Sequence, residues 1–258
     1  MPNLATARLS SASPRLRGEI IAYYQALFAR WGPQNWWPAQ SRLEVIVGAY
    51  LTQNTNWSNV EKAVANLRSA RVLSVKGLRE IPLRRLQTLV RPSGYFRQKA
   101  KKLKTFIRFL DKNYGGSLDR MFVQATEKLR KELLNLNGVG PETADSILLY
   151  GGNHHVFVVD AYTRRVLERH RIIAAKAKYE EIRTLLEAAV IGVRPEQMSL
   201  YRYSDKPRHP VSRMSRMPRS ELAQHYNELH ALIVRVGNQY CRSTPKCEEC
   251  PLKSFLTT

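Results

Sequence analysis

The sequence predicts an all-α protein built from many short helices. Apolar residues recur at helical spacing in several segments, such as Leu222, Tyr226, Leu229, Ile233 and Val236, or Tyr179, Ile182, Leu186 and Ala189. Alternating strand patterns are scarce: the β-like run 156–159 is short and equally fits an extended entry into a helix. With 258 residues and an apolar fraction of 43%, the chain can bury a sizeable core.

The charge balance indicates a polyanionic partner. The 42 Lys and Arg residues oppose 21 Asp and Glu residues, which leaves a formal charge of +21. Basic side chains that face phosphates release counterions, so this excess favours nucleic acid; a basic surface without a dedicated partner is the alternative. A membrane-spanning segment is not expected, because the longest apolar run, 45–51, is far shorter than the roughly 18 residues that span a bilayer. Membrane-surface binding is not expected either, because no single helix is both strongly basic and strongly amphipathic.

Two segments carry much of this charge. In 95–112, Lys and Arg alternate with Phe, Leu and Ile, which predicts a helix with one buried and one cationic face. The segment 202–219 contains three Pro and six Lys or Arg and lacks helical periodicity. We expect it to form an exposed basic loop, which either contacts DNA or is a linker that touches nothing.

The segment 129–151 has the pattern of two helices joined by a tight glycine turn. A helix with Leu at 129, 133 and 136 precedes the turn Gly138-Val139-Gly140, and Pro141 suits the first position of the next helix. Glycine permits positive φ and close approach to the backbone. The N–H groups of the turn and the helix start then form an anion site suited to a DNA phosphate. Taken alone, the pattern fits any αα-hairpin with a glycine turn.

This hairpin, followed by VVDAYTRRV with Asp160, resembles the helix-hairpin-helix (HhH-GPD) DNA glycosylase superfamily. Upstream, GAYLTQNTNWSNVEKAVANL (48–67) is similar to a segment of that superfamily, and SGYFRQKAKKLK (93–104) to a segment of its endonuclease III branch. Downstream, HALIVRVGNQYCRSTPKCEECPL (230–252) is similar to the iron–sulfur tail of that branch. The resemblance spans residues 35–252, with 202–219 as an insertion.

The resemblance implies two helical domains with the active cleft between them. A six-helix barrel that contains the hairpin would span 40–150, and 1–39 would join 151–258 in the second domain. The implied partner is duplex DNA that contains damaged bases, bound by a monomer. The residues implied to bind it are Gly138, Val139, Gly140, Thr143, Lys101 and Lys102.

Asp160 is the implied catalytic residue. Cleavage of an N-glycosidic bond develops oxocarbenium character at the sugar, which a carboxylate stabilises while it helps to activate water. Asp160 also fits the N-cap of a helix over 161–167, and the two roles can coexist. At the position of Glu142, the bifunctional endonuclease III enzymes carry the lysine that forms a Schiff base. The resemblance therefore predicts a glycosylase without AP lyase activity.

The hypothesis about the substrate depends on aromatic residues. NWWP (35–38), Trp57 and Glu142 resemble the 3-methyladenine glycosylases of this branch, in which such residues line the base pocket. Indole faces and a carboxylate favour a cationic alkylated purine. Two alternatives stay open: the paired tryptophans belong to the core, and Glu142 merely stabilises the start of its helix. The implied pocket residues are Trp36, Trp37, Pro38, Trp57, Gln53 and Glu142.

The three cysteines, Cys241, Cys247 and Cys250, lie close together near the C-terminus. This argues against a disulfide framework and for a metal or cluster site in a reducing compartment, the cytoplasm with its nucleoid if the chain is bacterial. The resemblance implies a 4Fe-4S cluster, but such clusters take four thiolates, and the place of the fourth cysteine reads Ser254-Phe255-Leu256. A cluster with one foreign ligand and a tail without iron both stay open.

The sequence thus supports the hypothesis of a monofunctional DNA glycosylase of base excision repair that removes alkylated purines such as 3-methyladenine. An endonuclease III-like glycosylase for oxidised pyrimidines is one alternative. A catalytically silent helix-hairpin-helix DNA-binding protein is the other.

Overall fold

The computed structural model describes residues 13–193, 207 and 209–256, and every regular element in these ranges is helical. The all-α prediction is confirmed. The run 156–159 is extended backbone directly before a helix, and all of its side chains are buried. Within the described ranges, no helix combines the length and the apolarity that a bilayer crossing requires.

Internal contacts divide the chain into two compact units, Met1–Pro38 with His155–Thr258, and Ala39–His154. The sequence-based boundaries lie after residues 39 and 150. That each unit is a domain in its own right stays a prediction.

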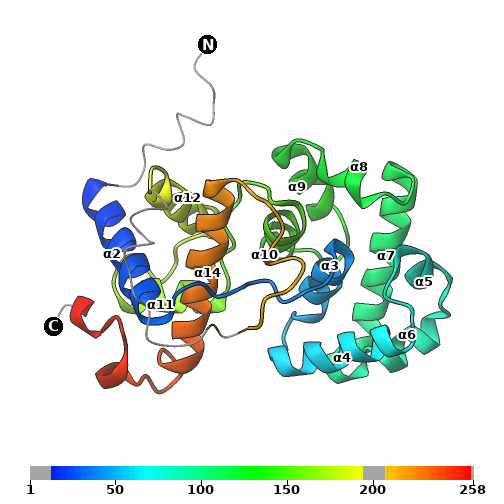
Figure 1. The fold of residues 1–258 in the computed structure, drawn as a ribbon, viewed down its shortest axis with the longest axis horizontal. Coiled ribbons are helices and arrows are strands. Elements are labelled where there is room, and N and C mark those ends of the chain that lie inside the picture. Colours follow the sequence, from blue (N-terminus) through cyan, green and yellow to red (C-terminus); the bar gives the residue numbers. More distant parts are fainter. Residues whose placement is uncertain (1–12, 194–206, 208, 257–258) are drawn as a thin grey trace, which may run out of the picture. The chain divides into compact units, whose positions relative to one another are not determined.

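The first unit is built around α14 (Glu221–Gln239), which packs against α2 (Pro14–Trp31), α11 (Ala161–Arg169) and α12 (Tyr179–Val190) (Figure 1). Segments from both ends of the sequence therefore meet at one helix. The buried stripe of α14 includes Leu229, Ile233 and Val236, as the helical spacing predicts. Two 3-10 turns, η3 (Cys247–Glu249) and η4 (Lys253–Phe255), follow it.

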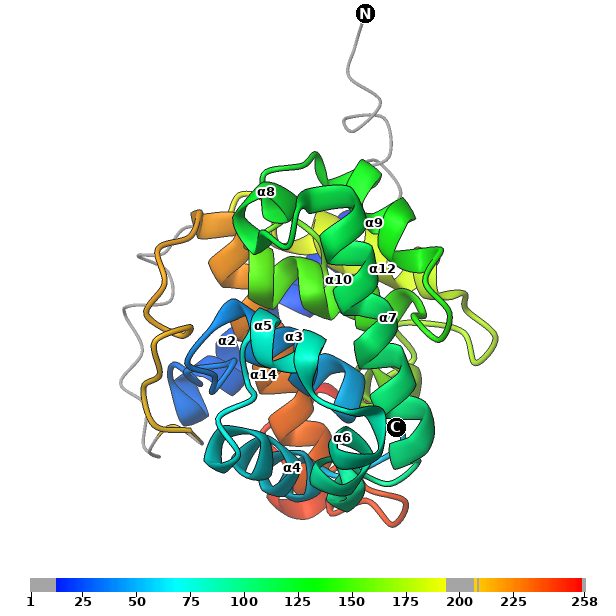
Figure 2. The same ribbon diagram turned by 90° about the vertical axis from the view of Figure 1, so that its right-hand side faces the viewer.

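The second unit is built around α3 (Arg42–Leu51), which is buried from Leu43 to its end. It packs against α4 (Trp57–Ser69), α7 (Phe96–Tyr114), α10 (Pro141–Ser146) and the π-helical turn η2 (Ile147–Gly151). Figure 2 shows α9 (Thr126–Leu134) beside α10. The remaining elements are α5 (Val75–Glu80), α6 (Leu83–Leu89), η1 (Arg91–Ser93) and α8 (Leu118–Phe122).

Two details differ from the sequence-based expectation. α9 ends at Leu134, so Leu136 lies in the turn, where its carbonyl accepts a hydrogen bond from Val139 N. Lys99 belongs to the buried face of α7, with 2% of its surface exposed, because Nζ donates to the carbonyls of Leu51 (2.9 Å) and Ser93 (2.5 Å). Burial, and then the charge of Lys102, lowers the pKa of Lys99 to about 8.

A buried ion pair joins the two helices that flank the glycine turn. Arg130 Nε on α9 lies 2.6 Å from Asp145 Oδ1 on α10, and Nη2 lies 3.1 Å from Oδ2. Asp145 is fully buried, so this two-point contact compensates both charges where water cannot. The pair fixes α9 and α10 relative to each other beside the turn.

We expect Asp145→Ala to destabilise the protein by about 3–5 kcal/mol, because it leaves the Arg130 guanidinium buried without its carboxylate. The midpoint of urea unfolding measures this loss. The double variant Arg130→Met/Asp145→Leu removes both charges and should recover most of it. A single variant within about 1 kcal/mol of the parent would show that the pair does not hold the hairpin helices.

Candidate functional site

The two glycines of the hairpin turn between α9 and α10 differ in conformation and in surroundings. Gly138 has a φ of +80°, where a side chain would be strained, and a Cβ there would lie 2.1 Å from Lys102 Cε, so Lys102 would have to move. Gly140 has an ordinary φ of −93° and is the N-cap of α10. A Cβ at Gly140 would meet nothing within 4 Å, which leaves the backbone there open to a ligand.

Gln53 connects the hairpin to α7. Its Nε2 donates to the Gly138 carbonyl (3.0 Å) and to Thr143 Oγ1 (2.9 Å), and its Oε1 accepts from Lys102 Nζ (2.6 Å). Burial lowers the pKa of Lys102. These contacts use both amide hydrogens of Gln53, so the structure places this side chain against the hairpin; its contact with a base stays a prediction. Four predicted residues, Gln53, Lys102, Gly138 and Thr143, thus form one network.

Val139 is buried, with 7% of its surface exposed, whereas three other predicted residues of the second unit are accessible. Glu142 is exposed in the first turn of α10, where a negative charge is stabilised by the helix dipole. Trp57 begins α4 half-buried, and its Nε1 donates to Glu61 Oε1 (2.8 Å). Lys101 is exposed on α7.

Tyr95 is a candidate that the sequence reasoning missed. It precedes α7 in the left-handed conformation (φ +45°), and its side chain is 64% exposed although it is large and apolar. Lys99 holds the neighbouring Ser93 carbonyl, so the turn that presents Tyr95 is anchored from inside. An exposed aromatic ring on a fixed turn is the kind of side chain that inserts between bases.

Asp160 is the N-cap of α11, as predicted, and its carboxylate is held in one orientation; its catalytic role stays a prediction. Oδ1 accepts a hydrogen bond from Thr163 N (2.7 Å) at the start of α11, and Oδ2 lies 3.7 Å from His230 Nε2 on α14. Burial lowers the pKa of His230, and Asp160 partly opposes this shift. The cap contact fixes the carboxylate, whose side chain is 14% exposed. His230 was not predicted.

The paired tryptophans are held by a polar network of the first unit. Gln34 N donates to Glu228 Oε1 (2.6 Å), and Gln34 Oε1 accepts from Arg235 Nη1 (3.1 Å); both partners lie on α14. Trp37 is 6% exposed and Trp36 and Pro38 are half-buried. The tryptophan rings contact each other at a centroid distance of 4.8 Å. Trp37 is therefore a core residue, whereas the ring of Trp36 is partly accessible.

The described part of the predicted basic loop docks on this tryptophan segment. Asn35 Nδ2 donates to the His209 carbonyl (3.1 Å), Ser212 Oγ donates to the Trp37 carbonyl (3.0 Å), and the ring centroids of Trp36 and His209 are 5.2 Å apart. Residues 209–219 are thus not a linker that touches nothing. Residues 202–206 and 208 lie outside the described part of the chain.

Comparison with known proteins identifies the family. The model of the HhH-GPD superfamily of base excision DNA repair proteins matches residues 47–190, more than half of the chain. The chain belongs to the HhH-GPD superfamily. A protein of Methanocaldococcus jannaschii named "Putative DNA repair glycosylase MJ1434" is 40% identical to this HhH-GPD protein over 240 residues, 92% of this chain and 94% of its own length. Endonuclease III of Thermotoga maritima is 25% identical over 211 residues, 81% of this chain and 80% of its own.

Solved structures agree with this assignment. The H. pylori 3-methyladenine DNA glycosylase MagIII, bound to 1,N6-ethenoadenine, has a TM-score of 0.69 and 28% identity over 87% of this chain and 97% of that one. A trapped endonuclease III–DNA covalent intermediate has a TM-score of 0.65 and 16% identity over 93% of this chain and 94% of that one, a likeness in fold alone. This HhH-GPD protein is a DNA glycosylase of base excision repair.

A four-thiolate cluster does not fit the tail of this HhH-GPD protein. Cys241, Cys247 and Cys250 line one small cavity, but no group of three or more His, Cys, Asp or Glu side chains among the described residues is arranged to hold a metal. Cys241 Sγ instead accepts a hydrogen bond from an arginine of α11 at 3.4 Å. Where a fourth cysteine is expected, Phe255 packs on the Tyr23 ring at a centroid distance of 4.9 Å.

Glu228 on α14 is the buried acid behind the tryptophan segment, and it was not predicted. Its oxygens accept from Gln34 N and from Gln224 Nε2 (3.3 Å), and Arg219 is nearby. Burial raises the pKa of Glu228 from 4.5 to about 7, although these three groups favour the carboxylate.

We expect Glu228 to make stability depend on pH. Its folded pKa lies above its unfolded value, so its contribution is fully present below pH 4.5 and is lost as pH rises toward about 7. Glu228→Gln should therefore gain stability relative to the parent across this window, as urea unfolding at a series of pH values would measure. Glu221→Gln, at an exposed position of the same helix, is the control. A parent–variant difference that does not change with pH would contradict the expectation.

Proposed function

We propose that this DNA glycosylase is monofunctional and removes alkylated purines such as 3-methyladenine from duplex DNA. The observation that carries the proposal is Glu142, an exposed carboxylate in the first turn after the hairpin. A carboxylate cannot form the imine on which strand cleavage depends. The similarity to MagIII, a 3-methyladenine DNA glycosylase, supports the same substrate class.

Asp160 is the proposed catalytic residue. As the bond between the base nitrogen and C1′ breaks, its electron pair leaves with the base and positive charge develops on the sugar. The Asp160 carboxylate, oriented by its contact with Thr163 N, stabilises that charge and takes a proton from the water that attacks C1′. His230 faces the other carboxylate oxygen and is a positioning residue. Because an alkylated purine is cationic, it departs as a neutral base.

The proposed recognition of the base uses aromatic faces and negative charge. Trp36 and Trp57 are both partly accessible, and each would contribute roughly 0.5–2 kcal/mol by contact with a cationic ring. Glu142 would attract the same positive charge. Trp37 and Pro38 complete the tryptophan segment but act mainly by holding Trp36 in place.

The proposed contact with duplex DNA centres on the hairpin. The N–H groups at Gly140 and at the start of α10 would bind a phosphate, and the open space at Gly140 admits it; the N–H of Val139 is already bonded to the Leu136 carbonyl, so Val139 would contribute by shaping the turn. Tyr95 would fill the stack that the extruded base leaves, because a base must leave the helix before its glycosidic bond can be reached. A monomer suffices for this arrangement.

We expect Asp160→Asn to lose base release by at least about a hundredfold while it retains affinity for DNA. Asparagine is also a good N-cap, so α11 should persist, and its circular dichroism melting curve serves as the control. Single-turnover release of 3-methyladenine from alkylated duplex measures the effect. Excision at the parental rate would show that Asp160 is only a cap.

Glu142→Lys tests the monofunctional assignment. The parent should give little borohydride-trapped DNA complex, since it offers no amine at this position. The variant should gain some trapping on abasic DNA and release 3-methyladenine more slowly. Glu142→Gln, which removes the charge without adding an amine, should slow release without trapping. Strong trapping by the parent would contradict the monofunctional assignment, and undiminished release by both variants would remove Glu142 from base recognition.

A further inference from the structure

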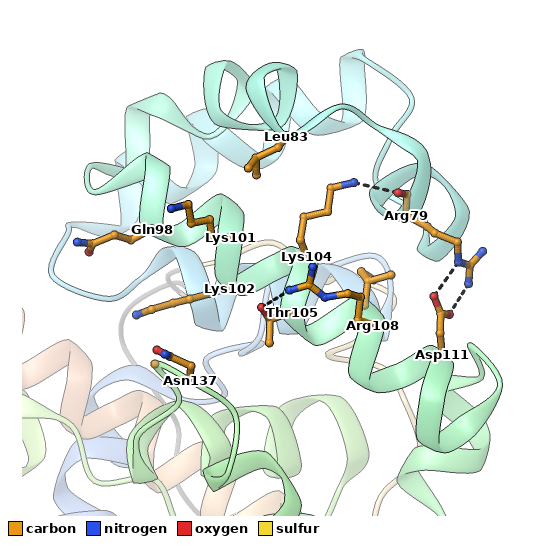
Figure 3. A pocket seen from close by; sticks show the side chains of 12 residues that line it. Arg79, Leu83, Gln98, Lys101, Lys102, Lys104, Thr105, Arg108, Asp111 and Asn137 are labelled. Carbon is orange, nitrogen blue, oxygen red and sulfur yellow. Dashed lines mark hydrogen bonds and ion pairs between the residues drawn. The ribbon is translucent and has the colours of Figure 1, made fainter.

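A large cationic cavity lies along α7, on the side where α7 faces the hairpin tip and the α5–α6 connection. Its volume is about 980 Å³. Figure 3 shows Lys101, Lys104 and Arg108 around it, with Asn137 at the hairpin end and Asp111 at the other. Five basic side chains and a single acidic one are among the described residues that line it: Arg79, Lys101, Lys102, Lys104, Arg108 and Asp111.

The single acid does not neutralise the cavity. Asp111 is held by a two-point contact with Arg79, at 2.9 Å from Nε and 2.6 Å from Nη2, so this pair closes one end. Lys104 Nζ donates to the carbonyls of Arg79 (2.9 Å) and Ile81 (2.5 Å), which fixes its amine in place. Burial, and then the charge of Arg108, lowers the pKa of Lys104. The wall therefore carries excess positive charge, and the Lys104 amine in it is already oriented.

The spacing of these side chains suits a chain of phosphates. One face of α7 carries a line of basic side chains that is about 10 Å long. Its members are Lys101, Lys104 and Arg108, at positions i, i+3 and i+7. A straight line of this length matches about two successive phosphates of one strand, because the strand winds around the helix axis while it rises ~3.4 Å per phosphate. None of the described residues that line the cavity is aromatic, which disfavours stacked bases or a nucleotide and favours the backbone.

The cavity is continuous with the hairpin. Asn137 and Gly138 of the turn line it, and Lys102 reaches from α7 to the hairpin through Gln53. We propose that this cavity binds the sugar-phosphate backbone of the duplex that flanks the lesion, and so extends the DNA contact from the hairpin along α7. The inference rests on the proposed function for the identity of that duplex, but not on which base is released.

The test is the double variant Lys101→Gln/Arg108→Gln. Both side chains are exposed, so the fold should persist, as thermal melting would verify. Lys62→Gln/Arg85→Gln is the matched control, because it removes two exposed charges of the same unit outside the cavity. The dissociation constant for an undamaged duplex is measured at several salt concentrations. The test variant should reduce the slope of log K against log salt by about 1.8, the value for two lost phosphate contacts.

A second measurement tests whether the contacted phosphates lie in the duplex beside the lesion. Methylphosphonate linkages, which carry no charge, are placed at successive positions outside the lesion. They should weaken binding of the parent and of the control by about threefold or more per contacted position, and should weaken binding of the test variant less, because it has already lost two of the contacts. Equal slopes for the test and control variants, or equal sensitivity to the neutral linkages, would overturn the proposal. Failure of the parent to release any base would overturn the proposed function and leave these binding results standing.

Discussion

The hairpin depends on the buried pair of Arg130 and Asp145. A glycine turn alone does not fix the direction of the two helices that it joins, and a buried charge without its partner costs several kcal/mol. With both charges compensated, α9 and α10 are held in one arrangement. In it, the aliphatic part of the Lys102 side chain packs against Gly138. The Gln53 amide then joins turn and helix. The proposed phosphate site is thus organised before DNA arrives, which lowers the cost of binding.

In the first unit, too, polar contacts hold the proposed functional groups in place. Its proposed catalytic carboxylate is fixed by a backbone N–H on one oxygen and faces a buried histidine on the other. Its tryptophan segment is fixed through Gln34 by Glu228 and Arg235, both on α14. α14 therefore contacts both the proposed catalytic carboxylate and the tryptophan segment, and a change in this helix should disturb both.

Local patterns predicted what depends on neighbours in the sequence. The glycine turn, the helix start at Pro141 and the N-cap at Asp160 are each encoded within a few residues, and the structure contains all three. The contacts of Glu228, His230 and Lys99 are not encoded in this way. Gln34 and Glu228, for example, are 194 positions apart, and periodicity cannot tell which buried polar groups will meet. The place of Tyr95 directly after a glycine is only a weak indication of its role, and its exposure is seen only in the structure.

The cysteine tail differs from the iron–sulfur tail that its sequence resembles. A pattern of three cysteines suggests a cluster, yet Phe255 of the tail packs on the ring of Tyr23, whose Oη is in turn hydrogen-bonded to His170 Nδ1 (3.1 Å). This aromatic contact attaches the end of the tail to α2.

Incubation of the purified protein with methylated duplex DNA tests whether this glycosylase is monofunctional and removes alkylated purines. The released bases are identified, and strand breaks are counted with and without alkali. We expect release of 3-methyladenine, with breaks only after alkali has opened the abasic sites. Release of no base, release confined to oxidised pyrimidines in a parallel oxidised duplex, or breaks without alkali would contradict it.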